Sequence, residues 1–163
     1  MIVVTIGTNE QPFERLIRAA RSLERDDLLV QYGSSREAHG RGEWVEFLTF
    51  DELSAKASAA QAVVCHAGVG SIMMARRCGH RPIVMARRHH LGEAVDDHQV
   101  MLGERLARAG IVTLVDDEVE LAAALTAEIG TAIAPTAPLS GTAALSASVR
   151  SVLEGLGAAR LAA

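Results

Sequence analysis

This sequence of 163 residues has few cysteines. It also lacks long apolar runs and an N-terminal targeting pattern. Its two cysteines, Cys65 and Cys78, lack C-x-x-C spacing and are too few for a disulfide framework, which favours a reducing cytoplasm. No apolar run approaches the roughly 18 residues of a membrane-spanning helix. The first residues, MIVVTIGTNEQ, have no basic flank and too short an apolar run for a signal peptide. We therefore expect a soluble protein whose membrane contacts are peripheral.

Lysine and an excess of charge of one sign are scarce as well. The 16 basic and 20 acidic residues leave a net charge of −4, which gives no reason to expect a nucleic-acid partner. Lys56 is the only lysine, so arginine supplies the other positive charges, and arginine suits forked contacts to phosphate. The length and the apolar fraction of 49% favour one globular domain.

Short apolar runs alternate with helical patterns along the first 128 residues. Strands are expected at 2–6, 28–31, 44–48, 62–65, 82–85 and 111–115. Helices are expected at about 12–24, from 51, and at 71–78, 97–109 and 117–128. Thr8 or Asn9 is the expected cap of the first helix. The alternation predicts an α/β fold, a Rossmann-like doubly wound parallel sheet of about six strands covered by helices on both faces.

The last part of the chain differs in composition. Residues 130–141 contain two prolines and two glycines, which is typical of a linker. Beyond it, apolar residues recur at helical spacing, namely Leu145, Val149, Val152, Leu153 and Leu156. We expect a main domain at 1–129, the linker at 130–141, and an amphipathic helix with a tail at 142–163. This helix either covers the sheet of its own chain or packs on another chain.

Two glycine-bearing loops follow the first and fourth predicted strands. If the strand order is the common 3-2-1-4-5-6, these strands flank the crevice in which ligands bind. Glycine lets backbone N–H groups approach an anion, and a helix N-terminus favours negative charge, so a phosphate or pyrophosphate suits this place. A tight turn without a ligand is the alternative, because short glycine patterns are weak motifs. The residues concerned are Gly7, Thr8 and Asn9 in the first loop and His66, Ala67, Gly68, Gly70 and Ser71 in the second.

Two common phosphate-binding classes do not fit these loops. A dinucleotide site needs G-x-G-x-x-G, but Met73 occupies the third glycine position. The second predicted strand also ends in Gln31, where such a site needs an acid for the ribose. The sequence has no G-K-S/T segment, which excludes a P-loop ATPase.

A second polar cluster, ARRHHLGEAVDDHQ, covers residues 86–99. Arg87 and Arg88 are predicted to pair with phosphate oxygens, and acidic residues at 96–97 suit a helix start. His98 and Gln99 would then face the same crevice. A solvated charged loop is one alternative. Another is a metal site, although its spacing matches no established zinc pattern, formed by His89, His90, Asp96 and His98.

Three segments in order carry a family resemblance: HAGVGS at 66–71, GHRPIV at 79–84 and DHQ at 97–99. Together they resemble the C-terminal, nucleotide-sugar-binding half of GT-B glycosyltransferases of family 28, over about residues 1–128. Within that family the chain is similar to single-domain proteins that supply only this half. These are the Alg13-type subunit of the eukaryotic N-acetylglucosaminyltransferase and the PssE-type subunit of bacterial exopolysaccharide synthesis. Residues 85–99 are closer to the bacterial group.

The resemblance implies residue roles. It implies that the glycine loop holds the diphosphate of UDP, that Thr8 and Asn9 line the crevice, and that the donor sugar contacts Asp97, His98 and Gln99. In two places the chain departs from the family. Met74 stands where relatives often carry a ribose-binding acid, for which Glu93 is the expected substitute, and Ala86 stands where bacterial relatives have proline. We expect no cofactor and no metal, with the UDP-sugar as substrate.

The resemblance also implies a function that needs a second polypeptide. We expect the donor-binding subunit of a two-component glycosyltransferase, which transfers a sugar from a UDP-sugar to a lipid-linked acceptor in exopolysaccharide biosynthesis. The partner would be a membrane-associated, acceptor-binding subunit of the Alg14 or PssD type, which supplies the general base and holds the protein at the inner face of the membrane. The alternatives are a non-catalytic nucleotide-sugar-binding or regulatory module and, from the histidine cluster, a metal-dependent hydrolase.

Overall fold

The protein's structure is a computed structural model in which residues 1–130 are described. The predicted C-terminal helix lies outside the described residues, and so does the predicted linker apart from its first residue. Within residues 1–130, no helix combines the length and the apolarity needed to cross a bilayer.

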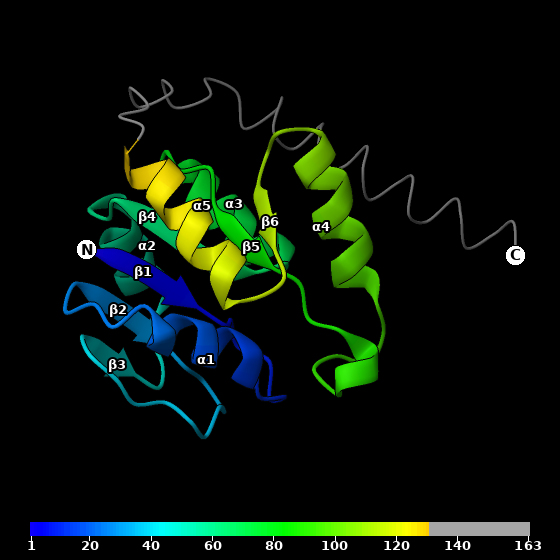
Figure 1. Cartoon of the computed structure of the whole chain (residues 1–163), viewed down its shortest axis with the longest axis horizontal. Helices are drawn as coiled ribbons and strands as arrows, with labels where there is room; N and C mark the ends of the chain where they lie inside the picture. Colours follow the sequence, from blue (N-terminus) through cyan, green and yellow to red (C-terminus); the bar gives the residue numbers. More distant parts are fainter. Residues whose placement is uncertain (131–163) are drawn as a thin grey trace, which may run out of the picture.

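Six parallel strands form one sheet in the order β3-β2-β1-β4-β5-β6 (Figure 1). The strands are β1 (Ile2–Thr5), β2 (Leu28–Gln31), β3 (Glu43–Val45), β4 (Ala62–His66), β5 (Ile83–Met85) and β6 (Thr113–Val115). The helices are α1 (Glu14–Ser22), α2 (Phe50–Ser58), α3 (Val69–Arg77), α4 (His98–Arg108) and α5 (Glu118–Gly130), with a 3₁₀ turn η1 (His89–Leu91) before α4. The predicted doubly wound, Rossmann-like fold with six parallel strands is confirmed.

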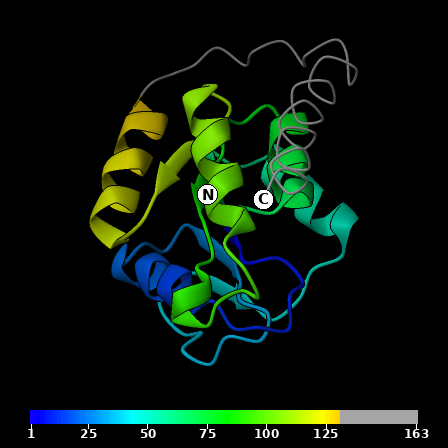
Figure 2. The same cartoon turned by 90° about the vertical axis from the view of Figure 1, so that its right-hand side faces the viewer.

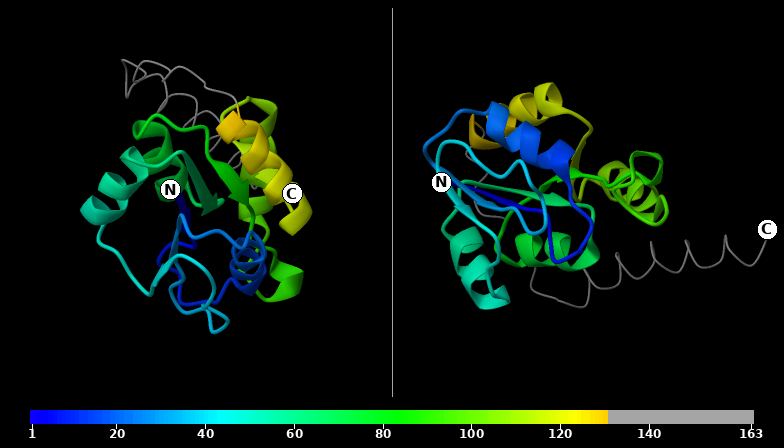
Figure 3. Two further views of the ribbon diagram at one scale, coloured as in Figure 1. Left: turned by 60° about the vertical axis from the view of Figure 1, so that its left-hand side comes forward. Right: turned by 90° about the horizontal axis from the view of Figure 1, so that it is seen from below.

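The sheet is buried on both faces because its central strands are apolar up to their last residue. On one face, α1 and α5 pack together over Val4 and Val64. On the other face, α2 and α3 pack on Val63, and α4 packs with α3 over Cys65. Figure 3 shows α1 and α5 on one side of the sheet and α2 and α3 on the other. The fourth helix, α4, faces the viewer in Figure 2.

The start of α1 differs from the prediction. The helix begins at Glu14, its N-cap is Phe13, and no side chain caps it, so the expected caps at Thr8 and Asn9 are wrong. A loop distant in sequence holds this helix start instead. Phe13 N donates to Ser35 Oγ at 2.9 Å, and Arg36 N donates to the Glu14 carboxylate at 2.7 Å. Tertiary contacts thus replace the local cap.

The segment after β3 also differs. The strand ends at Val45 rather than at 48, and the chain leaves the sheet toward α2. Thr49 and Glu52 form a capping box at the start of α2: Thr49 Oγ1 accepts from Glu52 N at 3.3 Å, and Thr49 N donates to the Glu52 carboxylate at 2.9 Å. The cap sets where α2 begins, directly after Phe47 and Leu48.

Removal of this cap is expected to destabilise the fold modestly. Thr49→Ala should lower the free energy of unfolding by about 1 kcal/mol, because the Glu52 N–H loses its acceptor. Urea denaturation would measure the loss. Thr126→Ala is the control, since Thr126 lies inside α5 and caps nothing. Equal stability of Thr49→Ala and the wild type would contradict the capping role.

Candidate functional site

A cavity of about 650 Å³ opens at the carboxyl ends of β1, β2 and β4. This is the place where the strand order reverses, since β1 pairs with β2 on one side and with β4 on the other. Its walls come from these strand ends and from α2 and α3. The lining residues are Thr5, Gly7, Thr8, Asn9, Gln31, Phe47, Leu48, Phe50, Leu53, His66, Gly70, Ser71 and Met74.

The His66 imidazole sits between two glycines. A Cβ on Gly7 would lie 2.4 Å from His66 Cε1, and a Cβ on Gly68 would lie 2.1 Å from His66 Nε2. Gly7 also has a φ of +78°, which L side chains rarely adopt. By contrast, a Cβ on Gly70 would meet nothing within 4 Å. Gly7 and Gly68 therefore make room for the ring, whereas packing does not require glycine at position 70.

His66 is uncharged at neutral pH. Burial, and secondarily the nearby charge of Arg87, lower the pKa of His66 to about 4. Its Nδ1 lies 3.4 Å from Ser71 Oγ, in the first turn of α3. The ring thus offers the cavity hydrogen-bonding atoms without a positive charge.

The floor of the cavity is polar and already hydrogen-bonded. Thr5 Oγ1 donates to Gln31 Oε1 at 3.0 Å and accepts from Gly7 N at 3.2 Å. Both Thr5 and Gln31 are buried. Sequence analysis did not assign them to the site. The available signal was that each is a polar residue at the carboxyl end of an apolar strand.

One wall of the cavity is apolar. It is formed by Phe47 and Leu48 before α2, Phe50 and Leu53 on α2, and Met74 on α3. The side chains of Phe47 and Phe50 are 59% and 62% exposed, which is unusual for phenylalanine. Exposed aromatic groups beside a pocket are typical of a binding site for a ring system. The sequence prediction missed this wall because it placed residues 44–48 in a strand.

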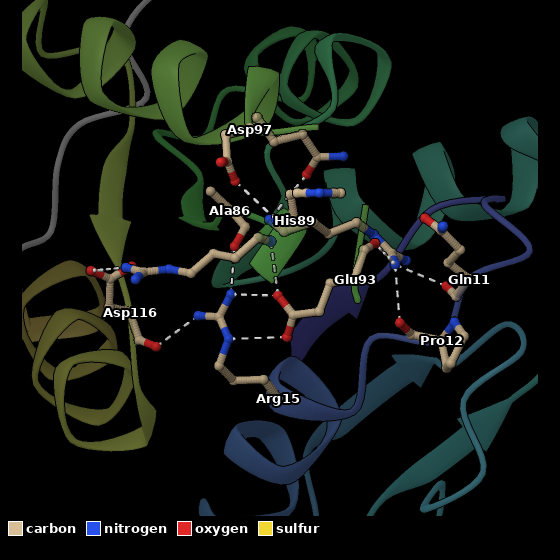
Figure 4. A network of polar contacts seen from close by, with 11 residues as sticks. Gln11, Pro12, Arg15, Ala86, His89, Glu93, Asp97 and Asp116 are labelled. Atoms are coloured by element: carbon tan, nitrogen blue, oxygen red, sulfur yellow. Dashed lines mark hydrogen bonds and ion pairs between the residues drawn. The ribbon is translucent and has the colours of Figure 1, made fainter. Parts of the chain in front are cut away.

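Of the fourteen residues predicted for the site, six line the cavity and eight do not. The six are Gly7, Thr8, Asn9, His66, Gly70 and Ser71. Ala67 is buried, and Gly68 packs against His66. The other six belong to the segment after β5. His98 pairs with Asp96, and the remaining five are part of a separate polar network with residues from α1 and from the β6–α5 loop (Figure 4).

The position of Arg87 contradicts the prediction that it binds a phosphate. The side chain is fully buried. Its Nη1 donates to the carbonyls of Gln11, Pro12 and Glu93 at 2.8, 3.2 and 3.0 Å, and its Nη2 donates to the Ile6 carbonyl at 3.2 Å. Backbone carbonyls have therefore taken the Nη donors that the prediction assigned to a ligand, while the buried Nε has no hydrogen-bond partner among the described residues.

Glu93 and Arg88 are likewise engaged within the protein. The buried Glu93 carboxylate forms a bidentate ion pair with Arg15, with Nε to Oε1 at 3.1 Å and Nη2 to Oε2 at 2.8 Å. It also accepts a hydrogen bond from Arg88 N at 3.0 Å. The Arg88 guanidinium pairs with Asp116 at 2.7 Å. This contradicts the expectation that Glu93 binds a ribose. Arg87, Arg88 and Glu93 thus form a structural network, while residues 89–92 of the same loop are exposed to solvent.

The start of α4 holds the remaining candidates. Asp97 Oδ1 accepts from His89 N at 2.9 Å, His98 Nδ1 lies 2.6 Å from Asp96 Oδ2, and Gln99 Oε1 accepts from Arg87 N at 3.3 Å. None of Asp97, His98 and Gln99 lines the cavity, and their contact with a donor sugar stays a prediction. Among residues 1–130, no three His, Cys, Asp or Glu side chains are grouped to hold a metal ion.

Comparison with known proteins gives similarities of three kinds: to a family model, to a curated protein and to solved structures. The sequence model of the glycosyltransferase family 28 C-terminal domain matches residues 1–136. The UDP-N-acetylglucosamine transferase subunit ALG13 of Yarrowia lipolytica (strain CLIB 122 / E 150) is 34% identical over 124 residues, covering 66% of this chain and 61% of that relative. The crystal structure of the glycotransferase of kitacinnamycin superposes with a TM-score of 0.54 at 17% identity, covering 96% of this chain and 39% of that one. At this identity the structural likeness concerns the fold alone.

The partly buried His66 predicts a specific pH dependence of stability. Its folded-state pKa of about 4 lies below the ordinary 6.5, so the unfolded chain binds the proton more readily. The stability contribution is thus complete above about pH 6.5 and is lost as the pH falls toward 4. Between pH 7 and pH 4.5, the wild type should lose about 2 kcal/mol more unfolding free energy than His66→Gln.

Urea denaturation at the two pH values would measure this difference. His90→Gln is the matched control, because His90 is exposed and lies outside the cavity. The same pH dependence in His66→Gln and the wild type would contradict the assignment.

Proposed function

The chain belongs to the glycosyltransferase family 28 C-terminal domain family, and from this premise we propose that it is the donor-binding subunit of a two-component UDP-sugar transferase. It would transfer the sugar to a lipid-linked acceptor in exopolysaccharide biosynthesis. The single observation that carries the donor-binding part is the cavity at the reversal of strand order. Its polar floor, apolar wall and open helix N-terminus match the three parts of a nucleoside diphosphate.

The diphosphate is proposed to lie at the start of α3. Gly70 and Ser71 are in the first turn of this helix, whose N–H groups point toward an incoming anion and whose dipole favours negative charge. Gly70 leaves open space above the backbone, so an anion can approach closely. Thr8 and Asn9 line the cavity from the β1–α1 loop and carry further hydrogen-bonding groups.

The nucleoside is proposed to lie against the apolar wall. The exposed rings of Phe47 and Phe50 offer stacking or edge contacts to a flat base. Thr5 and Gln31 on the floor can hydrogen-bond the polar edge of a base or a ribose. The volume of about 650 Å³ is of the size that small-molecule ligands occupy.

Direct transfer is the proposed chemistry. An acceptor hydroxyl oxygen attacks the anomeric carbon of the sugar, the bond from that carbon to the phosphate oxygen breaks, and UDP leaves with the electron pair. The helix N-terminus and main-chain donors would stabilise the departing diphosphate. No aspartate, glutamate, lysine or arginine lines the cavity. His66 does line it, but a pKa of about 4 makes its imidazole a weak base, so we propose that a second polypeptide supplies the base that takes the hydroxyl proton.

This second polypeptide is proposed to be a membrane-associated, acceptor-binding subunit of the Alg14 or PssD type. The Yarrowia lipolytica relative is named as a subunit of a transferase, which supports a partner for this chain. The same name specifies UDP-N-acetylglucosamine, which supports a UDP-sugar as the donor. The exopolysaccharide setting depends on the resemblance of residues 85–99 to the bacterial group. The protein would then work in the cytoplasm, at the inner face of the membrane, without a nucleic-acid partner.

The isolated chain is expected to bind UDP in the micromolar-to-millimolar range and to transfer no sugar. Calorimetric titration with UDP, UDP-glucose, UDP-glucuronate and UDP-N-acetylglucosamine would test binding. Addition of the partner subunit should restore transfer, which a non-catalytic binding module would not show. An absence of binding heat with all four ligands would contradict the proposal.

Bulk at position 70 is expected to block the diphosphate. Gly70→Val should weaken UDP binding at least about tenfold, and Gly70→Ala should have a smaller effect, because the added methyl groups occupy the open space at the helix start. The melting temperature should not fall in either variant, since no neighbouring atom is displaced. Calorimetry and thermal unfolding would be measured together. UDP affinity that is unchanged across this size series would show that the loop is only a turn.

A further inference from the structure

Arg87 is a buried cation without a carboxylate partner. Within residues 1–130 it is the largest side chain that is fully buried, and none of the ion pairs there involves it. The nearest acid, Glu93, directs its carboxylate to Arg15 and gives Arg87 only its carbonyl. Burying a cation in this way costs free energy. We therefore look for a role of the charge that an apolar side chain could not fill.

The four carbonyls that Arg87 contacts lie on two loops. Ile6, Gln11 and Pro12 lie toward the two ends of the β1–α1 loop, and Glu93 belongs to the loop between β5 and α4. The Phe13 ring lies against the guanidinium, with its centroid 4.7 Å from Cζ. One planar group therefore clamps both ends of the short segment 7–10.

That segment lines the cavity but has little support of its own. Thr8 and Asn9 are exposed. Gly7 N donates to Thr5 Oγ1, and Asn9 Oδ1 accepts from Gln11 N within the loop. From outside the loop, Ser34 Oγ donates to the Asn9 carbonyl at a long 3.4 Å. The position of this side of the cavity thus depends mainly on the clamp at its two ends.

We propose that Arg87 is a positioning residue of the diphosphate site: it holds the β1–α1 loop against the cavity and supplies, from beneath, the positive charge that the lining lacks. This inference rests on the proposed function. Because the guanidinium is fully buried, it acts on the anion through its charge and through the loop, not by contact. In a poorly hydrated interior such a charge is weakly screened.

The charge of Arg87 acts on one residue of the cavity lining. It contributes, after burial, to the lowered pKa of His66, whose ring lines the cavity. A positive charge that disfavours a protonated imidazole there favours an anion in the same place. Arg87 therefore has a means to discriminate between an anionic and a neutral ligand, which a purely structural side chain does not have.

Two substitutions separate the clamp from the charge. Arg87→Lys keeps the charge but cannot span both loops, so we expect UDP affinity to fall, by less than in Arg87→Met, while uridine affinity changes little. Arg87→Met removes the charge as well, so UDP affinity should fall at least about tenfold while uridine affinity falls no more than about threefold. Dissociation constants for both ligands would be measured on the full chain by NMR-detected titration, with thermal unfolding of each variant.

Arg76→Met is the matched control. Arg76 is a partly buried arginine that donates to the His80 carbonyl and does not line the cavity. We expect both ligands to keep wild-type affinity within about twofold in this variant.

The outcomes separate the two claims. If the wild type does not bind UDP, the proposed function fails. If the wild type binds UDP but Arg87→Met weakens UDP and uridine equally, the charge part of the inference is wrong. If Arg87→Met does not fold, Arg87→Lys carries the test, and wild-type UDP affinity in that variant would overturn the positioning role.

Discussion

The parallel pairing of β1 with β4 is the constraint on which the site depends. It joins two strands that are about sixty residues apart in sequence and aligns Thr5 with Cys65. The two loops that follow are thereby brought into contact, with the His66 ring between Gly7 and Gly68. A side chain at either glycine would collide with the ring, so the register of the strands and the shape of the cavity cannot change independently.

The distribution of charge is the second organising feature. The cavity lining carries no charged acidic or basic side chain, whereas the neighbouring loop after β5 is rich in them. These charges are used to hold irregular backbone in place: Arg87 binds four carbonyls and Glu93 binds Arg15. Irregular loops leave backbone carbonyls unpaired, and arginine has enough donors to satisfy several of them at once.

This arrangement separates support from binding. The charged network fixes the loops from within, and the surface offered to a ligand consists of main-chain donors, small polar groups and an apolar wall. Such a surface can hold a nucleoside diphosphate but has no carboxylate to remove a proton from an acceptor. The geometry is therefore in keeping with a donor-binding half whose partner contributes the remaining chemistry, as we propose.

The sequence by itself determined the alternation of strands and helices and the glycine loops after β1 and β4, because these depend on local patterns of two to ten residues. It predicted six cavity residues for the same reason. Only the tertiary structure decided that Ser35 and Arg36, not Thr8 or Asn9, hold the start of α1. It also decided that Arg87 and Glu93 turn inward, because three of the four carbonyls that bind Arg87, and the Arg15 that pairs with Glu93, lie more than seventy residues away, beyond the reach of any local pattern.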